Sequence, residues 1–298
     1  MYQKLDTFFV ALYTIVDDLY QEQFSDAMKR KPGVKPKFAD SEVITLSLAR
    51  ELLSFASERC FLGFVRTNMS HLFPNAVEQS QFNRRTRYLH LAINHLRRKL
   101  LDKIGAGLEA YRVIDTTDVP VVEFGRACST TLFKGEAAYG HSSSKKATHY
   151  GFKLFVMATL EGMPLDFGLF PANTDDQVTA DDVLDFHRDI IVIADKGFLD
   201  KDRALSLKKE RNITMLSLKR ANQKLYDKKE NKLLSSFRQI IETVNELLKD
   251  HFNLEKHLAR TLEGLKTRIV TKITGLTIGI YMNKLFGFNA LALRCLVF

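Results

Sequence analysis

The segment DIIVIADKGF, residues 189–198, restricts the fold more than any other part of the sequence. Its residues 190–194 are all apolar, so a strand formed here would bury both of its faces. Such a strand lies inside a sheet that helices cover on each side. Helical patterns precede and follow the segment, at residues 179–188 and 201–211. The sequence therefore predicts an α/β fold in which a mixed sheet is flanked by helices.

Other segments have the β-branched and aromatic composition of strands. The first is YRVIDTTDVPVVEF at 111–124, where the pattern changes abruptly. GFKLFVMATL and PLDFGLFPA follow, and the residues 161–163 between them predict a hairpin. A strand TMLSL, a basic loop at 219–232 and a long helix at 235–250 complete this part.

Residues 1–105 have apolar positions at helical spacing and no strong strand pattern. One helix should begin at Asp40 or Ser41. Another should cover residues 81–104, and four leucine and isoleucine side chains of it should face inward: Leu89, Leu91, Ile93 and Leu96. We therefore expect an all-helical domain at 1–105 and a sheet-containing domain at 106–298.

Charge points to the class of partner. The formal net charge is +9 and the pI is near 9.3, which favours a polyanion such as nucleic acid. One basic cluster lies in SQFNRRTRY and contains Arg84, Arg85 and Arg87. This run is either a helix that binds DNA or a solvated basic face.

Several function classes are disfavoured by composition. The three cysteines are far apart and form no C-x-x-C pair, which argues against a disulfide framework and a zinc knuckle. The first 20 residues lack the features of a signal peptide. Charged residues interrupt the apolar C-terminal stretch before it reaches membrane-spanning length. We expect a cytoplasmic protein with no membrane partner.

Three carboxylates are the candidate catalytic residues. The strand runs RVID and IIVIAD end at Asp115 and Asp195, where a rigid backbone can present a carboxylate to a cleft. Each Asp could instead cap the loop after it. On the helix SFRQIIETVNELLK, Glu242 falls in a polar stripe beside an apolar one. The polar stripe comprises Arg238, Glu242, Asn245 and Lys249.

These carboxylates suggest metal chemistry. Hard oxygen ligands on separate elements favour Mg²⁺ or Mn²⁺ over zinc. Two such ions can activate a water or a 3′-hydroxyl and stabilise the leaving oxygen in a phosphodiester displacement. The simpler alternative for Glu242 is a solvated i,i+4 salt bridge with Arg238.

Two other polar groups are weaker candidates. An acidic group near residue 180 is more typical of helix capping than of metal binding. It comprises Asp175, Asp176, Asp181, Asp182 and Asp185. His141 and His149 lie in a Ser- and Lys-rich region, where DNA contact or a solvated role fits better than catalysis.

These motifs together resemble the DDE transposases of bacterial insertion sequences. The resemblance covers most of the chain, including DSEVITL, VIDTTDVPV, VIADKGF and RQIIETVNELLK, with the three carboxylates in family order. Within the family the chain resembles the insertion-sequence 982 type, related to the insertion-sequence 4 superfamily. The resemblance implies an RNase H-like catalytic core, a helical DNA-binding domain ahead of it, Mg²⁺ dependence and recognition of terminal inverted repeats.

Carried onto this sequence, the resemblance makes Asp115, Asp195 and Glu242 the metal ligands. It implies that Arg238 and Lys249 contact phosphate or position the helix of Glu242. It also places three lysines near the path of the DNA: Lys145, Lys146 and Lys153. The motif DTTD departs from the family pattern, which leaves Asp118 as a competing ligand.

The function that this implies is metal-dependent cleavage of double-stranded DNA and strand transfer into target DNA. The resemblance also implies a homodimer in the synaptic complex and a location at the nucleoid. Two rival functions stay open at this point. One is a nuclease or resolvase on the same fold, and the other is a non-catalytic DNA-binding protein derived from a transposase.

Overall fold

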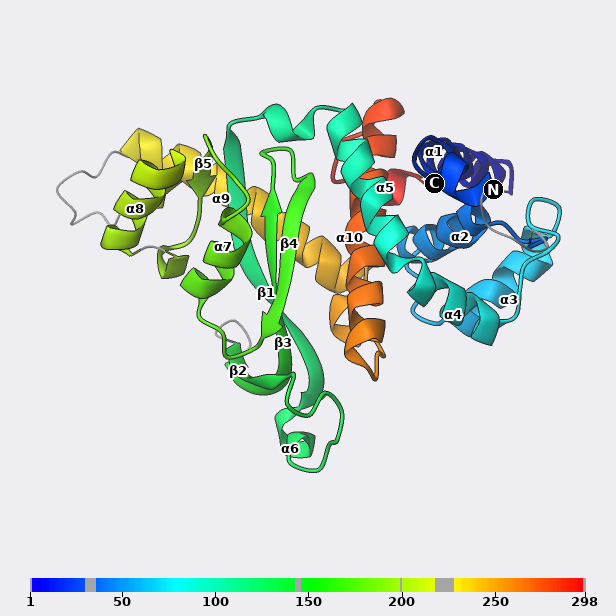
Figure 1. Ribbon diagram of the computed structural model, residues 1–298, viewed down its shortest axis with the longest axis horizontal. Coiled ribbons are helices and arrows are strands. Elements are labelled where there is room, and N and C mark those ends of the chain that lie inside the picture. The colour runs from blue at the N-terminus through cyan, green and yellow to red at the C-terminus, as the bar shows by residue number, and fades with distance from the viewer. Residues whose placement is uncertain (1, 30–35, 143–145, 199, 218–227, 297–298) are drawn as a thin grey trace. The chain divides into compact units, whose positions relative to one another are not determined.

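The computed structural model describes residues 2–29, 36–142, 146–198, 200–217 and 228–296 (Figure 1). It divides into two compact units. The helical unit comprises residues 1–104, 250–259 and 263–298, and the sheet unit comprises residues 105–249 and 260–262. The first division falls between residues 104 and 105. Residues 263–296 group with the N-terminal helices and not with the sheet.

The described residues of the sheet unit form six strands in one mixed sheet. The strand order is β2-β3-β1-β5-β6, and β4 also pairs with β3. β1 runs antiparallel to β3, and β3 runs antiparallel to β2 and β4, whereas β5 is parallel to β1 and β6. The bounds are β1 Tyr111–Glu123, β2 Ala138–Ser142, β3 Ala147–Ala158, β4 Pro164–Pro171, β5 Ile191–Ile193 and β6 Thr214–Leu216.

This sheet confirms the α/β prediction and the hairpin of β3 and β4. One expectation about β1 is wrong, because Asp115 lies within the strand and not at its end. β1 continues to Glu123 because β3 supplies a pairing partner along almost its whole length, from Val113 to Glu123.

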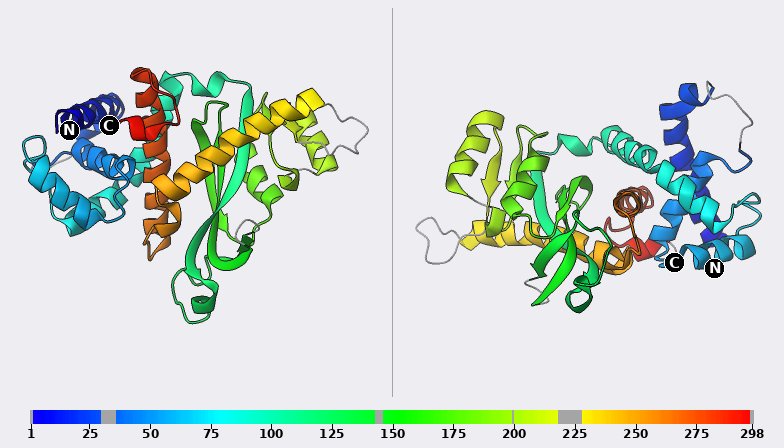
Figure 2. Two further views of the ribbon diagram at one scale, coloured as in Figure 1. Left: turned by 180° about the vertical axis from the view of Figure 1, so that it is seen from behind. Right: turned by 60° about the horizontal axis from the view of Figure 1, so that its bottom comes forward.

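Helices cover both faces of this sheet (Figures 1 and 2). On one face, α7 packs Ala180, Val183 and Leu184 into a core with Ile114 and Phe155. On the other face, α9 crosses β1 (Figure 2, left). The bounds in this unit are η1 Ala106–Leu108, α6 Phe124–Ala127, α7 Asp176–Leu184, η2 Lys196–Phe198, α8 Lys201–Arg211 and α9 Lys228–Glu246, which continues as the π-helix η3 Leu247–His251.

Helix α9 begins at Lys228, which corrects the prediction of a loop through residue 232. The basic run KKENK is compatible with a solvated helix face, because helix propensity and not polarity decides its conformation. Residues 219–227 of the same predicted loop lie outside the described residues.

In the helical unit the described residues form helices and turns without a strand, as expected for the N-terminal part. The bounds are α1 Tyr2–Lys29, α2 Asp40–Leu52, α3 Glu58–Asn68, α4 Gln79–Tyr88, α5 His90–Lys103, η4 Leu254–Lys256, α10 Leu262–Leu285 and η5 Leu293–Leu296. α2 begins at Asp40, as predicted.

The single helix expected at 81–104 is two helices, α4 and α5. Leu89 interrupts them with φ −88° and ψ 2°, so the apolar stripe does not continue unchanged across the break. Leu89, Ile93 and Leu96 are buried, but Leu91 is 63% exposed, which corrects its assignment to the inward face.

Helix α10 has a long buried segment. Its residues are buried without interruption from Ile269 to Ile280, including three threonines and Lys272. None of the described helices combines the length and the apolar character that spanning a bilayer requires.

Candidate active site

Asp115 lies on β1 beneath helix α9. Its Oδ1 accepts a hydrogen bond from the backbone N–H of Thr116 at 2.8 Å, and its Oδ2 accepts one from Asn245 Nδ2 at 2.9 Å. Burial raises the pKa of Asp115 to about 6, although these two hydrogen bonds and nearby Arg238 act in the opposite direction. The carboxylate is therefore short of positive charge.

Asp195 and Glu242 share one guanidinium group. Arg238 Nη1 lies 3.6 Å from Asp195 Oδ1, and Arg238 Nη2 donates to Glu242 Oε1 at 3.2 Å. The two carboxylate side chains are about half exposed, 53% for Asp195 and 52% for Glu242. The simple i,i+4 salt bridge considered for Glu242 is present, and the same cation also reaches the second acid.

Strand register explains why the two aspartates lie near each other. β1 and β5 are parallel neighbours, and Val113 is paired with Ile193. Asp115 comes two residues after Val113, and Asp195 comes two residues after Ile193. The two aspartates therefore lie at the same height along the two neighbouring chain segments. Because side chains alternate along a strand, Asp115 is on the same face of β1 as Val113.

Helix α9 brings the third acid to this face. Ile241, Val244 and Leu248 are fully buried, which holds this helix against the sheet. The polar stripe next to these residues then brings Asn245 to Asp115 and places Glu242 next to Arg238, which also reaches Asp195. Among the described residues, no three His, Cys, Asp or Glu side chains are close enough to enclose a metal ion.

Asp118, the competing ligand, is on the other face of β1. It is three residues from Asp115, so alternation directs it away from Asn245. Its Oδ1 lies 3.8 Å from His149 Nε2, on β3. His149 is therefore buried beside this carboxylate and not in an exposed loop.

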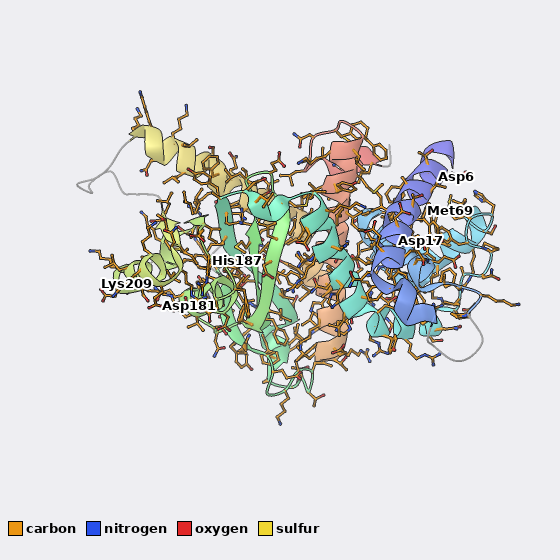
Figure 3. The ribbon with its side chains drawn as sticks, turned by 45° about the horizontal axis from the view of Figure 1, so that its top comes forward. Asp6, Asp17, Met69, Asp181, His187 and Lys209 are labelled. Carbon is orange, nitrogen blue, oxygen red and sulfur yellow. The ribbon has the colours of Figure 1, made fainter. Side chains whose placement is uncertain are left out.

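The acidic group near α7 is engaged within the protein. Asp175 caps α7 through the backbone N–H of Gln177, as its position predicts. Asp181, labelled on α7 in Figure 3, pairs with Arg203, and Asp185 pairs with Arg211.

Asp176 differs from its neighbours in this group because it approaches the candidate site. Its Oδ1 accepts from Thr116 Oγ1 at 3.1 Å and from Lys153 Nζ at 2.8 Å, and its charge contributes to the raised pKa of Asp115. Asp176 thus lies behind β1, opposite Asp115.

The basic residues assigned to DNA contact differ in exposure. Lys146 is exposed in the turn between β2 and β3, Lys153 is committed to Asp176 and Thr174, and Lys249 is half-buried. Lys145 lies outside the described residues.

In the helical unit, Arg84 and Arg87 are exposed on α4. Arg85 instead donates to the backbone oxygen of Phe38 at 2.7 Å and to Asp40 Oδ1 at 2.6 Å. These arginines remain predicted DNA contacts, and Arg85 also has a structural role at the start of α2.

The sequence missed two functional candidates, Asn245 and Asp176. Asn245 falls in the polar stripe with Glu242, and that position was the available signal. Nothing in the acidic run distinguished Asp176 from its four neighbours, because the distinction depends on contacts with β1 and β3.

Comparison with known proteins gives one match. A family model described as a transposase DDE domain matches residues 106–262, which is more than half of the chain. No curated protein and no solved structure matches the chain.

Proposed function

Because the chain belongs to the DDE transposase family, we propose that it cleaves DNA at the terminal inverted repeats of an insertion sequence and joins the ends to target DNA. We assign it to the insertion-sequence 982 type, related to the insertion-sequence 4 superfamily. The working form that we propose is a homodimer that holds two DNA ends at the nucleoid.

We propose Asp115, Asp195 and Glu242 as the ligands of Mg²⁺ or Mn²⁺. The observation that carries this proposal is that two side chains of α9 reach all three carboxylates: Asn245 bonds to Asp115 of β1, and Arg238 contacts both Asp195, after β5, and Glu242. Their oxygen donors fit these hard cations, which usually retain water and accept phosphate oxygens. When bound, the ions would supply an activated water or 3′-hydroxyl and stabilise the leaving oxygen.

The protein's own residues would prepare these ligands. Asn245 orients the Asp115 carboxylate by its hydrogen bond to Oδ2. Arg238 contacts both Asp195 and Glu242 and so holds the Asp195 carboxylate on the side of α9 that carries Glu242. Once a divalent cation balances these acids, the guanidinium can turn to a DNA phosphate, which it would bind through paired N–H donors.

The fold supports the same proposal. A mixed sheet in which β3 pairs antiparallel with β1, β2 and β4, and β5 is parallel to β1 and β6, is consistent with an RNase H-like core. We propose DNA binding for residues 1–105 and catalysis for 106–298, with helix α10 structurally part of the helical unit. Exposed Arg84, Arg87 and Lys146 are proposed phosphate contacts.

The test is a cleavage and strand-transfer assay with labelled ends of the element, in Mg²⁺ or in EDTA. We expect the wild type to cleave and join only with the metal, and Asp195→Asn to do neither. Asp118→Asn is the matched control, on the face of β1 away from the site, and should retain both activities.

The alternative functions predict other products. Cleavage without joining would indicate a nuclease or resolvase, and binding without cleavage would indicate a non-catalytic DNA-binding protein. Full activity of Asp195→Asn would refute the ligand assignment.

A further inference from the structure

A second polar cavity lies within the helical unit and plays no part in the site described above. Its volume is about 120 Å³, whereas one water takes about 30 Å³ in the liquid. It is lined by the end of α2, the start of α3, the turn 252–258 and one side of α10. The space is therefore large enough for a small polyatomic ligand.

The lining has an excess of positive charge. Four basic side chains line the cavity, Arg50, Lys256, Arg268 and Lys272. Only two carboxylates do so, Glu51 and Glu58, which leaves two positive charges in excess.

The two carboxylates are already shared among these cations. Arg50 bonds to Glu51 and lies 2.9 Å from Glu58, Lys272 Nζ lies 2.8 Å from Glu51, and Arg268 Nη1 lies 2.6 Å from Glu58. Glu58 also accepts two hydrogen bonds from Asn83. The acids thus have little capacity left to balance the remaining charge.

One buried donor in this group has no partner. Arg50 is only 5% exposed, and its Nε makes no hydrogen bond within the described structure. Burial lowers the pKa of Arg268 and of Lys272, and the charge of Arg50 lowers both further. The positive charges of Arg50, Arg268 and Lys272 therefore repel one another.

Hydrogen bonds next to the cavity join the end of α2 and the turn after it to His251, at the end of the π-helix. Ser54 Oγ donates to the backbone oxygen of His251 at 2.6 Å, and His251 Nε2 is 2.9 Å from the backbone oxygen of Leu52. Ser54, Asn253 and Leu258 all have left-handed backbone angles, with φ between 50° and 57°. Non-glycine residues adopt such angles where the surrounding structure imposes them, so the cavity is built before any ligand arrives.

We propose that this cavity binds a phosphate group. A phosphate dianion would balance the two excess charges and accept from the N–H donors of the basic side chains that line the cavity. Guanidinium groups suit phosphate because their N–H donors match its oxygens. The start of α3, capped by Ser57, also faces the cavity, and helix N-termini favour anions. The phosphate comes either from the solution or from a DNA backbone.

The first experiment titrates inorganic phosphate into the full chain in EDTA, with sodium chloride keeping the ionic strength constant, and follows heat and Tm. We expect saturable binding and a rise in Tm for the wild type. Arg268→Gln should weaken binding about tenfold or more, the effect of losing a hydrogen bond to a charged group. Lys256→Gln should also weaken it, and its exposed position makes misfolding an insufficient explanation.

The control is Lys266→Gln, which removes an exposed basic residue of α10 that does not line the cavity. We expect this variant to bind phosphate like the wild type. Absence of saturable binding by the wild type, or an equal loss in Lys266→Gln, would overturn the proposal.

A second experiment identifies the source of the phosphate, using a fluorescent DNA duplex. If the ligand is a backbone phosphate, inorganic phosphate competes with the duplex. Lys256→Gln then makes the DNA affinity less dependent on salt concentration, by the equivalent of about one phosphate contact. If the ligand is free phosphate, neither inorganic phosphate nor the Lys256→Gln substitution changes the affinity for DNA. This arm rests on the proposed function, whereas the titration does not, so the two ideas can fail separately.

Discussion

Replacing Asp115 by Asn should make the metal-free protein relatively more stable as pH rises. The difference between the ordinary pKa of 3.8 and the value of about 6 in the fold corresponds to about 3 kcal/mol. Part of the carboxylate is exposed, so solvent screening reduces our expectation to about 2 kcal/mol.

The sign follows from the direction of the shift. A carboxyl group whose folded pKa is raised contributes stability below its unfolded pKa, and this contribution is lost as pH rises through about 6. Asn has no such titration. It accepts through one oxygen only, so it also loses one of the two hydrogen bonds to Asp115, at a cost of about 1 kcal/mol that does not depend on pH.

The measurement is urea unfolding in EDTA at about pH 4 and pH 7.5, values that bracket the expected titration. We subtract the free energy of unfolding of the wild type from that of Asp115→Asn at each pH. This difference should increase by about 2 kcal/mol from the lower pH to the higher one. Asp118→Asn, on the same strand, serves as the control. A difference that is constant or decreases with pH would refute the argument that Asp115 is buried without sufficient positive charge.

Four further substitutions test individual contacts. Asn245→Ala removes the hydrogen bond to Asp115, and cleavage assays across metal concentrations should show about a 10- to 100-fold loss of metal affinity or rate. Glu51→Ala leaves Lys272 buried without its carboxylate and should cost about 3–5 kcal/mol in urea unfolding. Gly151→Ala would place Cβ 2.4 Å from the backbone oxygen of Val119, so Tm should fall by an amount that corresponds to about 1–3 kcal/mol. Leu91→Glu changes an exposed side chain and should alter the unfolding free energy by no more than about 0.5 kcal/mol; a larger loss would restore its assignment to the core.

The strands and the long helices could be predicted because their patterns are local. The apolar run at residues 190–194 predicted a central strand, and β5 indeed lies between β1 and β6. The break at Leu89 could not be predicted in the same way, since helical spacing fits both one helix and two. β2 was also missed, because AYGHS has little β-branched content and depends on pairing with β3.

The candidate site was predicted as three acids but not as a set of contacts. Local patterns placed Asp115, Asp195 and Glu242 on their elements, whereas the register of β1 and β5 determines that two of them lie at one level. The roles of Asn245 and Asp176 depend on which side chains face each other across the sheet. Sequence spacing carries no information about such pairings between distant segments.

The position of α10 gives the protein an order of assembly. The sheet unit is inserted in the chain between two parts of the helical unit, and Glu51 finds its partner Lys272 at a distance of 221 residues. At translation rates of about 5–20 residues per second, the ribosome makes Lys272 on the order of 10–40 s after Glu51. The first-made helices therefore stay incomplete until the whole insert has left the ribosome. A chain that stops before α10 would contain every residue of the candidate catalytic site and still lack part of the core of the unit that was translated first.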